Sequence, residues 1–324
     1  MSHEVETMAY AGAVPWHGLG VPVSNDLTPA QMMQKAGLDW TVEKVPTYAR
    51  VGDTVLSQIE IPTGVEALVR SSDNKVLTQV GENWNPVQNE EAFEFFSEYV
   101  LAGDMEMHTA GSLKGGQMVW ALAKIKESFD ILGGDQVDSY LLFSNPHQYG
   151  KSIDVRFTPI RVVCNNTLTM SLGQQVANSC KMNHRSEFNP QKVKEALGIA
   201  HEKFDQYKEM AEFLAKRRFT MDSLIQYYNE VFPRTYTGKK SPDNVQQFED
   251  LTTNAKKAFE VLETQPGAEF AEGSWWQALN SVTYLTDHIM GREADSRLTS
   301  AWFGSNQTRK QRAVEKAVEF AVAA

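Results

Sequence analysis

The hydrophobic periodicity of this 324-residue chain changes near residue 188, and this change limits the fold more than any other feature. Before it, Ile153, Val155 and Phe157 alternate with polar residues, which is the period-2 pattern of a half-buried strand. After it, apolar residues recur at alternating spacings of four and three, a seam that predicts a long helix packed on other helices. The seam consists of Val193, Leu197, Ala200, Phe204, Tyr207, Ala211 and Leu214.

The two patterns predict an α+β fold in two parts. We expect a β-rich core domain over residues 1–187, with a mixed or antiparallel sheet and a few helices. A helical C-terminal domain is expected over residues 188–324, and residues 233–244 are the best linker within it.

Several local signals predict the ends of particular helices. Thr28, Pro29 and Gln31 have the pattern of a helix cap, a proline in the first turn and a capping box. Asn89 is the expected cap of a helix over residues 90–101. Further helix starts are predicted at Asn189, Ser241, Ser274 and Asn306, the last for a helix that ends near Ala323.

Strand signals fill much of the first half of the chain. Residues 67–70 and 75–78 flank a polar Ser-Ser-Asp-Asn segment, which predicts a hairpin. Strands are also expected at 117–125 and 137–144, and Lys114 would then lie at an exposed hairpin tip.

Charge is distributed unevenly along the chain. The net charge is −10, yet residues 151–240 contain 15 basic and 9 acidic residues, whereas residues 1–150 contain 8 and 20. A protein that is acidic overall repels polyanions, but a local basic face binds them if the acids lie elsewhere. Two cysteines, no apolar run of bilayer length and no secretion signal at the N-terminus predict a cytoplasmic protein.

Several short motifs together resemble one known family. Near the start is Pro15-Trp16-His17-Gly18-Leu19-Gly20, followed by Pro86-Val87-Gln88-Asn89 and by Ala110-Gly111-Ser112 with Gly116. The longest piece is Pro159-Ile160-Arg161-Val162-Val163-Cys164-Asn165-Asn166-Thr167-Leu168. Thr286-Asp287-His288 and Ala301-Trp302-Phe303-Gly304 lie near the end. In combination they resemble the phage/plasmid-like protein family, a domain of unknown function (number 932). The loop at residues 145–150 departs from the family's Ser-His-Asp-Gly pattern.

The resemblance implies a phage- or plasmid-encoded protein that acts in replication or recombination. The β-rich core with a following helix is also similar in outline to phage single-strand annealing proteins, which is an analogy of fold.

The segment around Arg161 is the main candidate binding site. An apolar strand stops there at polar residues, and we expect a helix to start next, an arrangement suited to a phosphate. Arg161 would bind the phosphate, and Asn165, Asn166 and Thr167 would donate hydrogen bonds. Other basic residues would extend the site: Lys114, Lys151, Arg156, Lys181 and Arg185. In the alternative interpretation Asn166 or Thr167 only caps the helix, and Arg161 pairs with a nearby acid.

Other chemistry has weaker support in the sequence. Cys164, Cys180 and His184 lack the fourth ligand and the close cysteine pair of a structural zinc site, so no metal or other cofactor is predicted. Nucleotide-binding loops and metalloprotease motifs are absent from the sequence. Arg309, Lys310 and Arg312 lie early in the last predicted helix, where the helix dipole disfavours cations, so a partner or backbone contact is expected there.

We therefore expect a non-enzymatic protein that binds single-stranded DNA in the host cytoplasm and acts as a homo-oligomer. The alternative is an interaction or assembly protein of a phage, such as a virion, anti-defence or host-takeover factor. A host or phage protein would then bind through the helical C-terminal region.

Overall fold

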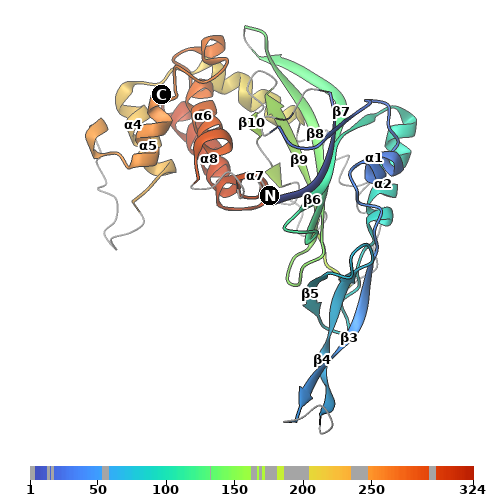
Figure 1. Ribbon diagram of the computed structural model, residues 1–324. Coiled ribbons are helices and arrows are strands. Elements are labelled where there is room, and N and C mark those ends of the chain that lie inside the picture. The colour runs from blue at the N-terminus through green and yellow to red at the C-terminus, as the bar shows by residue number, and fades with distance from the viewer. Residues whose placement is uncertain are drawn as a thin grey trace. The chain divides into compact units, whose positions relative to one another are not determined.

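A computed structural model of the chain has an α+β architecture, as predicted (Figure 1). The structure describes residues 4–12, 15, 18–52, 58–131, 133–161, 166–167, 170–171, 181–185, 204–234, 247–291 and 297–324. Its strands lie in the first part of the chain and its last part is helical. Within these ranges, no helix combines the length and apolar character that a membrane span needs.

The chain forms two compact units that are interleaved along the sequence. The sheet-rich unit contains residues 1–126, 141–156 and 171–199, and the helical unit contains residues 127–140, 157–170 and 200–324. Strands β7 (Met118–Ile131), β8 (Asp135–Pro146) and β9 (Ile153–Arg161) contribute residues to both units. The predicted linker at 233–244 lies mostly outside the described residues and stays a prediction, as does the predicted boundary at 187.

The main sheet has the strand order β10-β9-β8-β7-β6-β1-β2, and β11 and β12 also pair with β9. The remaining strands are β1 (Val5–Ala11), β2 (Val21–Val23), β6 (Met105–Leu113), β10 (Asn166–Thr167), β11 (Met170–Ser171) and β12 (Lys181–Met182). Strand β1 pairs parallel to β2, whereas β1–β6, β6–β7 and β9–β10 are antiparallel. The sheet is therefore mixed.

A second sheet has the order β3-β4-β5. Its strands are β3 (Val42–Val51), β4 (Ile59–Arg70) and β5 (Val76–Val80), all antiparallel, which confirms the hairpin predicted around residues 71–74. Lys114 has a φ of 53° and is exposed in the turn between β6 and β7, so its predicted place at a tip is also confirmed.

Two helices pack against each other and against β6 in the sheet-rich unit (Figure 1). Helix α1 (Pro29–Lys35) has the predicted capping box, in which Thr28 Oγ1 accepts from Gln31 N and Gln31 Oε1 accepts from Thr28 N. Helix α2 (Asn89–Ala102) begins one residue earlier than predicted, because Gln88 is its N-cap residue. Asn89 is instead buried, and its side chain bonds to the carbonyls of Leu38 and Trp40.

The helical unit packs around one almost wholly buried helix, α6 (Trp275–Tyr284), capped by Ser274 as predicted. The other described helices are residues 204–216, α4 (Met221–Val231), α5 (Thr253–Glu260), α7 (Arg297–Phe303) and α8 (Ser305–Ala323), with 3₁₀ turns at Phe248–Asp250 and Ala268–Ala271. After Lys310, the buried residues of α8 are all small, Ala313, Ala317 and Ala321, so this part of α8 can approach its neighbours α4 and α6 closely.

Aromatic side chains fill the core of this unit. Phe204 and Tyr207 of the predicted seam pack edge-on against Phe129, and Tyr207 also contacts Trp276. Trp276 Nε1 donates to Asp135 Oδ2 at 2.9 Å, which satisfies the indole N–H in the core. The seam is therefore a packing face within the chain along its described part, residues 204–216.

Candidate functional site: a cationic cleft in the helical unit

The predicted basic residues of the sheet-rich unit differ in how free they are to bind an anion. Lys114, Lys151 and Arg185 are exposed. Arg156 is not free, because its guanidinium lies 2.7 Å from Asp154 Oδ2 and donates to the same carboxylate through Nε at 2.8 Å. Both side chains of this pair are mostly buried. The expectation that Arg156 faces a phosphate is therefore at odds with the structure, since a neighbouring acid already neutralises it.

The segment after Arg161 was expected to begin a helix, and this expectation is wrong. Asn166 and Thr167 form strand β10, which pairs antiparallel with β9, with Asn166 opposite Arg161 and Thr167 opposite Ile160. A strand lacks the free N–H groups that a helix offers at its start, so the phosphate site cannot be of that type. Asn165 and the side chains of Arg161, Asn166 and Thr167 lie outside the described residues.

The backbone of Lys181 lies near that of Arg156 in the sheet. It lies in β12 opposite Asp154 of β9, and its side chain is likewise not described. Cys164 and Cys180 also lie outside the described ranges, so the zinc alternative is not tested. His184 is buried, stacks on Trp84 at 4.2 Å and bonds through Nδ1 to the carbonyl of Asn85.

One family motif, residues 86–89, contacts the loop at residues 145–150 in a buried polar network of the sheet-rich unit. His147 Nε2 lies 3.0 Å from Asn89 Oδ1, and Asn145 Nδ2 donates to the carbonyl of Val87 at 2.9 Å. Because the Asn89 amide already donates to two carbonyls, its oxygen accepts, and His147 must carry its proton on Nε2. Burial, and to a smaller extent the charge of His184, lower the pKa of His147 to about 3, so His147 is neutral. These buried hydrogen bonds attach the start of α2 to the end of β8.

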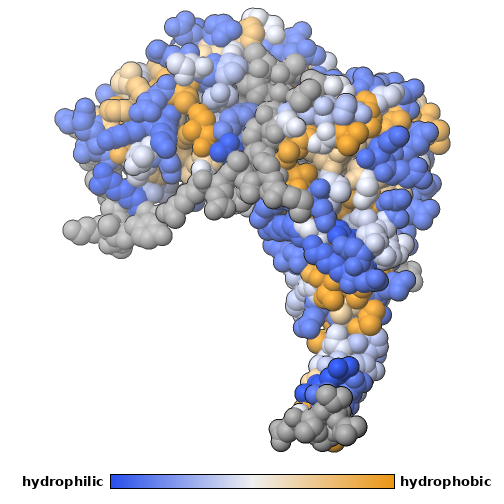
Figure 2. All heavy atoms as spheres, viewed as in Figure 1, coloured by the Kyte–Doolittle hydropathy of each residue, from blue (hydrophilic) through white to orange (hydrophobic). Residues whose placement is uncertain are grey.

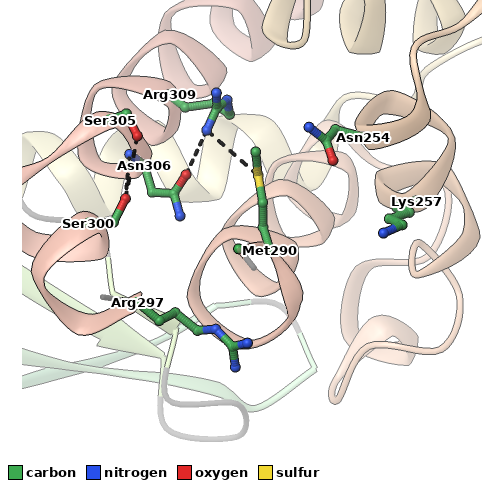
Figure 3. A pocket seen from close by; sticks show the side chains of 9 residues that line it. Asn254, Lys257, Met290, Arg297, Ser300, Ser305, Asn306 and Arg309 are labelled. Atoms are coloured by element: carbon green, nitrogen blue, oxygen red, sulfur yellow. Dashed lines mark hydrogen bonds between the residues drawn. The ribbon is translucent and has the colours of Figure 1, made fainter. Parts of the chain in front are cut away.

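The strongest site geometry lies elsewhere, in a cleft of the helical unit (Figure 3). We use the name cationic cleft for two pockets of about 440 and 670 Å³ that share Asn254, Ser305 and Arg309. The first pocket is also lined by Lys257, Met290, Gly291, Arg297, Ser300 and Asn306. The second is lined by Val231, Phe232, Pro233, Arg234, Thr252, Thr253, Thr308 and Arg312. Five cationic side chains thus line the cleft, and no Asp or Glu is among the lining residues that the structure describes.

Arg309 lies at the centre of the cationic cleft. It donates to Asn306 Oδ1 at 2.6 Å and approaches Met290 Sδ at 3.6 Å (Figure 3). Its guanidinium also stacks over the Phe232 ring, 5.5 Å from the ring centroid. Burial, and then the charge of Arg312, lower the pKa of Arg309. A guanidinium nevertheless stays charged, so a bound anion would relieve this unfavourable electrostatic environment. In the described part of the chain, no carboxylate forms an ion pair with Lys257, Arg309 or Arg312.

A π-helical turn and two side-chain hydrogen bonds position the backbone beside the cationic cleft. Helix α6 continues into a π-helical turn at Leu285–Ile289, a kind of turn found often at functional sites. Arg297 Nη1 donates to the carbonyl of His288 at 2.7 Å, and Asn306 Nδ2 donates to that of Thr286 at 3.0 Å. These two bonds attach α7 and the first turn of α8 to the π-helical turn.

A buried ion pair lies beneath this attachment. Lys310 Nζ lies 2.7 Å from Asp287 Oδ1, and the two side chains are 1% and 3% exposed. The expectation that Lys310 contacts a partner is therefore wrong, whereas Arg309 and Arg312 line the cleft. Asn306 is not the cap of α8 either, since Gly304 is its N-cap residue and Asn306 is buried one residue inside the helix.

The cationic cleft brings together residues that are up to 81 positions apart, from Val231 to Arg312. No local pattern in the sequence predicts that these residues line one cleft. The two C-terminal motifs, Thr286-Asp287-His288 and Ala301-Trp302-Phe303-Gly304, were the available signal, because they include the π-helical turn and the entry to α8. They indicated that this region belongs to the family pattern, but not that it surrounds a cleft.

Comparison with known proteins agrees with the motif evidence. The fold and the site define the class of this protein: an α+β protein with a cationic cleft in its helical unit. The family described as "Domain of unknown function (DUF932)" matches residues 76–314, most of the chain, and this protein belongs to that family. No curated protein and no solved structure matches the chain.

Proposed function

We propose that this protein binds single-stranded nucleic acid, without catalysis, through contacts between the cationic cleft and the phosphate backbone. The observation that carries the proposal is the set of five cationic side chains around one cleft whose described lining contains no carboxylate. Phosphates are the abundant anions that such a surface suits, and Arg binds them through two N–H groups at once. The acidic remainder of the chain would limit contacts elsewhere.

The biological setting belongs to the same proposal. The protein is encoded by a phage or plasmid and supports recombination or replication in the host cytoplasm, as its family motifs suggest. The exposed Lys114, Lys151 and Arg185 of the sheet-rich unit would add phosphate contacts. Binding through phosphates depends little on base sequence and weakens strongly with salt.

The test is a titration of a fluorescent single-stranded oligonucleotide, followed by anisotropy at several salt concentrations. The double variant Lys257→Ala/Arg312→Ala removes two exposed cations of the cationic cleft. We expect its Kd to rise roughly tenfold or more, and the slope of log K against log salt to become shallower by about 1.4, at about 0.7 per phosphate contact.

A matched control is available in the same unit. Lys208→Ala/Lys216→Ala removes two exposed cations from the helix at residues 204–216, outside the lining of the cationic cleft. Its Kd should stay close to that of the unaltered protein. An equal loss in both double variants would contradict a site at the cleft, and the absence of binding at low salt would refute the function itself. The variant Lys151→Ala/Arg185→Ala measures what the sheet-rich unit adds.

A further inference from the structure

The cationic cleft has a polar part and a partly apolar part, which meet at Arg309. We call the first pocket, of about 440 Å³, the recess. The second pocket, of about 670 Å³, is wider and includes Val231, Phe232 and Pro233. Both volumes are in the range of about 300–1,000 Å³ that small ligands occupy, whereas a strand that runs across a protein contacts about 4–16 nucleotides. Each pocket therefore suits a piece of nucleic acid of about the size of a nucleotide.

The first turns of two helices line the cleft. Thr252, Thr253 and Asn254 lie at the start of α5, and Ser305, Asn306 and Thr308 lie at the start of α8. Neither helix has an acidic residue in its first turn, and no side chain caps α8, because its N-cap residue is Gly304. The start of a helix has N–H groups without partners in the helix and is the positive end of its dipole. Both features favour an anion and add to the charge of the cationic side chains.

The recess concentrates positive charge from several elements. Lys257, Arg297 and Arg309 line it, and no acidic residue is among its described lining residues. In Figure 3, Asn254 and Lys257 of α5 lie on one side of Met290, and Arg309 of α8 lies on the other. The surface over α4 and α5 is mostly hydrophilic in the view of Figure 2. These surroundings suit a strongly charged group and not an apolar one.

Arg309 keeps a binding edge available for such a group. Its hydrogen bond to Asn306 and its contact with Met290 both use Nη1, so no described residue occupies the edge formed by Nε and Nη2. The stacking over Phe232 fixes the plane of the guanidinium and leaves this edge open. Two N–H groups on one edge of a guanidinium match two oxygens of a phosphate.

The kind of phosphate follows from the charge of the recess. A phosphodiester within a strand carries one negative charge, whereas a phosphate monoester carries about −1.5 to −2 at pH 7 and has three strong acceptor oxygens. A monoester therefore neutralises three cations and two helix starts better than a diester does. In a nucleic acid, such a group is found only at the end of a strand.

We propose that the recess binds the terminal phosphate of a single strand and that the wider pocket holds the nucleotide attached to it. This inference rests on the proposed function and adds to it a preference for strand ends. The chemistry of the monoester is the same at a 5′ end and at a 3′ end, so the experiment tests both.

The test compares three forms of one single-stranded oligonucleotide, with the fluorescent dye on an internal base so that both ends stay free. One form has a 5′-phosphate, one has a 3′-phosphate, and one has hydroxyl groups at both ends. We expect at least one phosphorylated form to bind roughly tenfold or more tightly than the hydroxyl form, since a single charge-assisted hydrogen bond accounts for about that factor. Anisotropy titrations at one salt concentration give the three Kd values.

Two variants locate the terminal phosphate. Arg309→Lys keeps the charge but loses the two-pronged edge, so the ratio of Kd between the hydroxyl and phosphorylated forms should fall towards one. Lys257→Ala should lower the same ratio, and because Lys257 is exposed its loss leaves the core intact. The control Lys208→Ala/Lys216→Ala lies outside the lining of the cleft and should keep the full ratio.

The outcomes separate this inference from the function on which it rests. Clear binding with the same Kd for all three forms would overturn the preference for ends and leave single-strand binding intact. A preference that survives unchanged in both Arg309→Lys and Lys257→Ala would overturn the recess as its site. If no form binds at low salt, the proposed function itself is refuted.

Discussion

The buried ion pair between Lys310 and Asp287 allows a direct test of how the cationic cleft is held in place. The Lys310→Met variant removes the ammonium group that lies 2.7 Å from the Asp287 carboxylate, which is 3% exposed. Breaking one partner of a buried ion pair costs about 3–5 kcal/mol, because the remaining charge keeps its desolvation penalty and loses its attraction. We expect the free energy of unfolding of the helical unit to fall by that amount.

Urea and thermal unfolding, followed by far-ultraviolet circular dichroism and tryptophan fluorescence, would measure this loss. At about 2–4 °C per kcal/mol for a unit of this size, Tm should fall by roughly 6–20 °C. Trp275 and Trp276 are fully buried at the start of α6, so they contribute to the tryptophan fluorescence when this unit unfolds.

The double variant Lys310→Met/Asp287→Leu separates the pair from the packing around it. Replacing both charges with apolar side chains leaves no uncompensated charge, and such replacements are often neutral or stabilising. We therefore expect most of the stability to return. The reasoning is refuted if Lys310→Met alone costs less than about 1 kcal/mol, or if the double variant is as unstable as the single one.

Two further predictions concern the sheet-rich unit. The folded protein keeps His147 neutral down to about pH 3, whereas the unfolded chain protonates it near pH 6.5. Between these two pH values the unfolded state binds one more proton, so the free energy of unfolding should fall by about 1.4 kcal/mol for each unit by which the pH is lowered. Urea midpoints at several pH values would measure this slope, and an unchanged slope in His147→Gln would contradict the assignment. Gly111→Ala should cost about 1–3 kcal/mol, since its Cβ would clash with the Thr7 carbonyl and the Trp120 ring. Gly81→Ala, where nothing lies within 4 Å, should leave the melting temperature nearly unchanged, and equal losses in both variants would refute the clash.

Local sequence signals predicted the local structure well. The capping box at Thr28, the cap at Ser274 and the seam from Phe204 to Leu214 are each confirmed, because each depends on residues within a few turns of one another. Asn89 and Asn306 show the limit of such signals. Asparagine is a good N-cap residue, yet Asn89 lies one residue after the N-cap of its helix and Asn306 lies two residues after it. Both side chains are buried and donate to backbone carbonyls that are distant in the sequence.

The candidate site was predicted in part only. The strand ending at Arg161 is present, but β10 follows it where a helix was expected, since strand pairing satisfies the same backbone groups. Arg309 and Arg312 were expected to contact a partner, but the cationic cleft as a whole escaped prediction. Its other cations come from α5, α7 and the segment after α4, and the C-terminal 84 residues are acidic as a whole. Net charge over a segment does not reveal which side chains meet in space. Lys310, in the same basic group as Arg309 and Arg312, became a core residue because its helix position points inward to Asp287.

The interleaving of the two units along the chain affects how the protein can be divided experimentally. Strands β7, β8 and β9 each carry residues of both units, so a fragment that stops at residue 187 would include residues 127–140 and 157–170 without the helices of their own unit. A fragment from residue 188 onwards would lack those same strand segments, including Asp135, the acceptor for Trp276. We expect neither half to fold stably when expressed alone. A deletion variant would then lose activity because it is misfolded, even where the deleted residues do not contact the ligand. Point substitutions in the intact chain are the suitable tool.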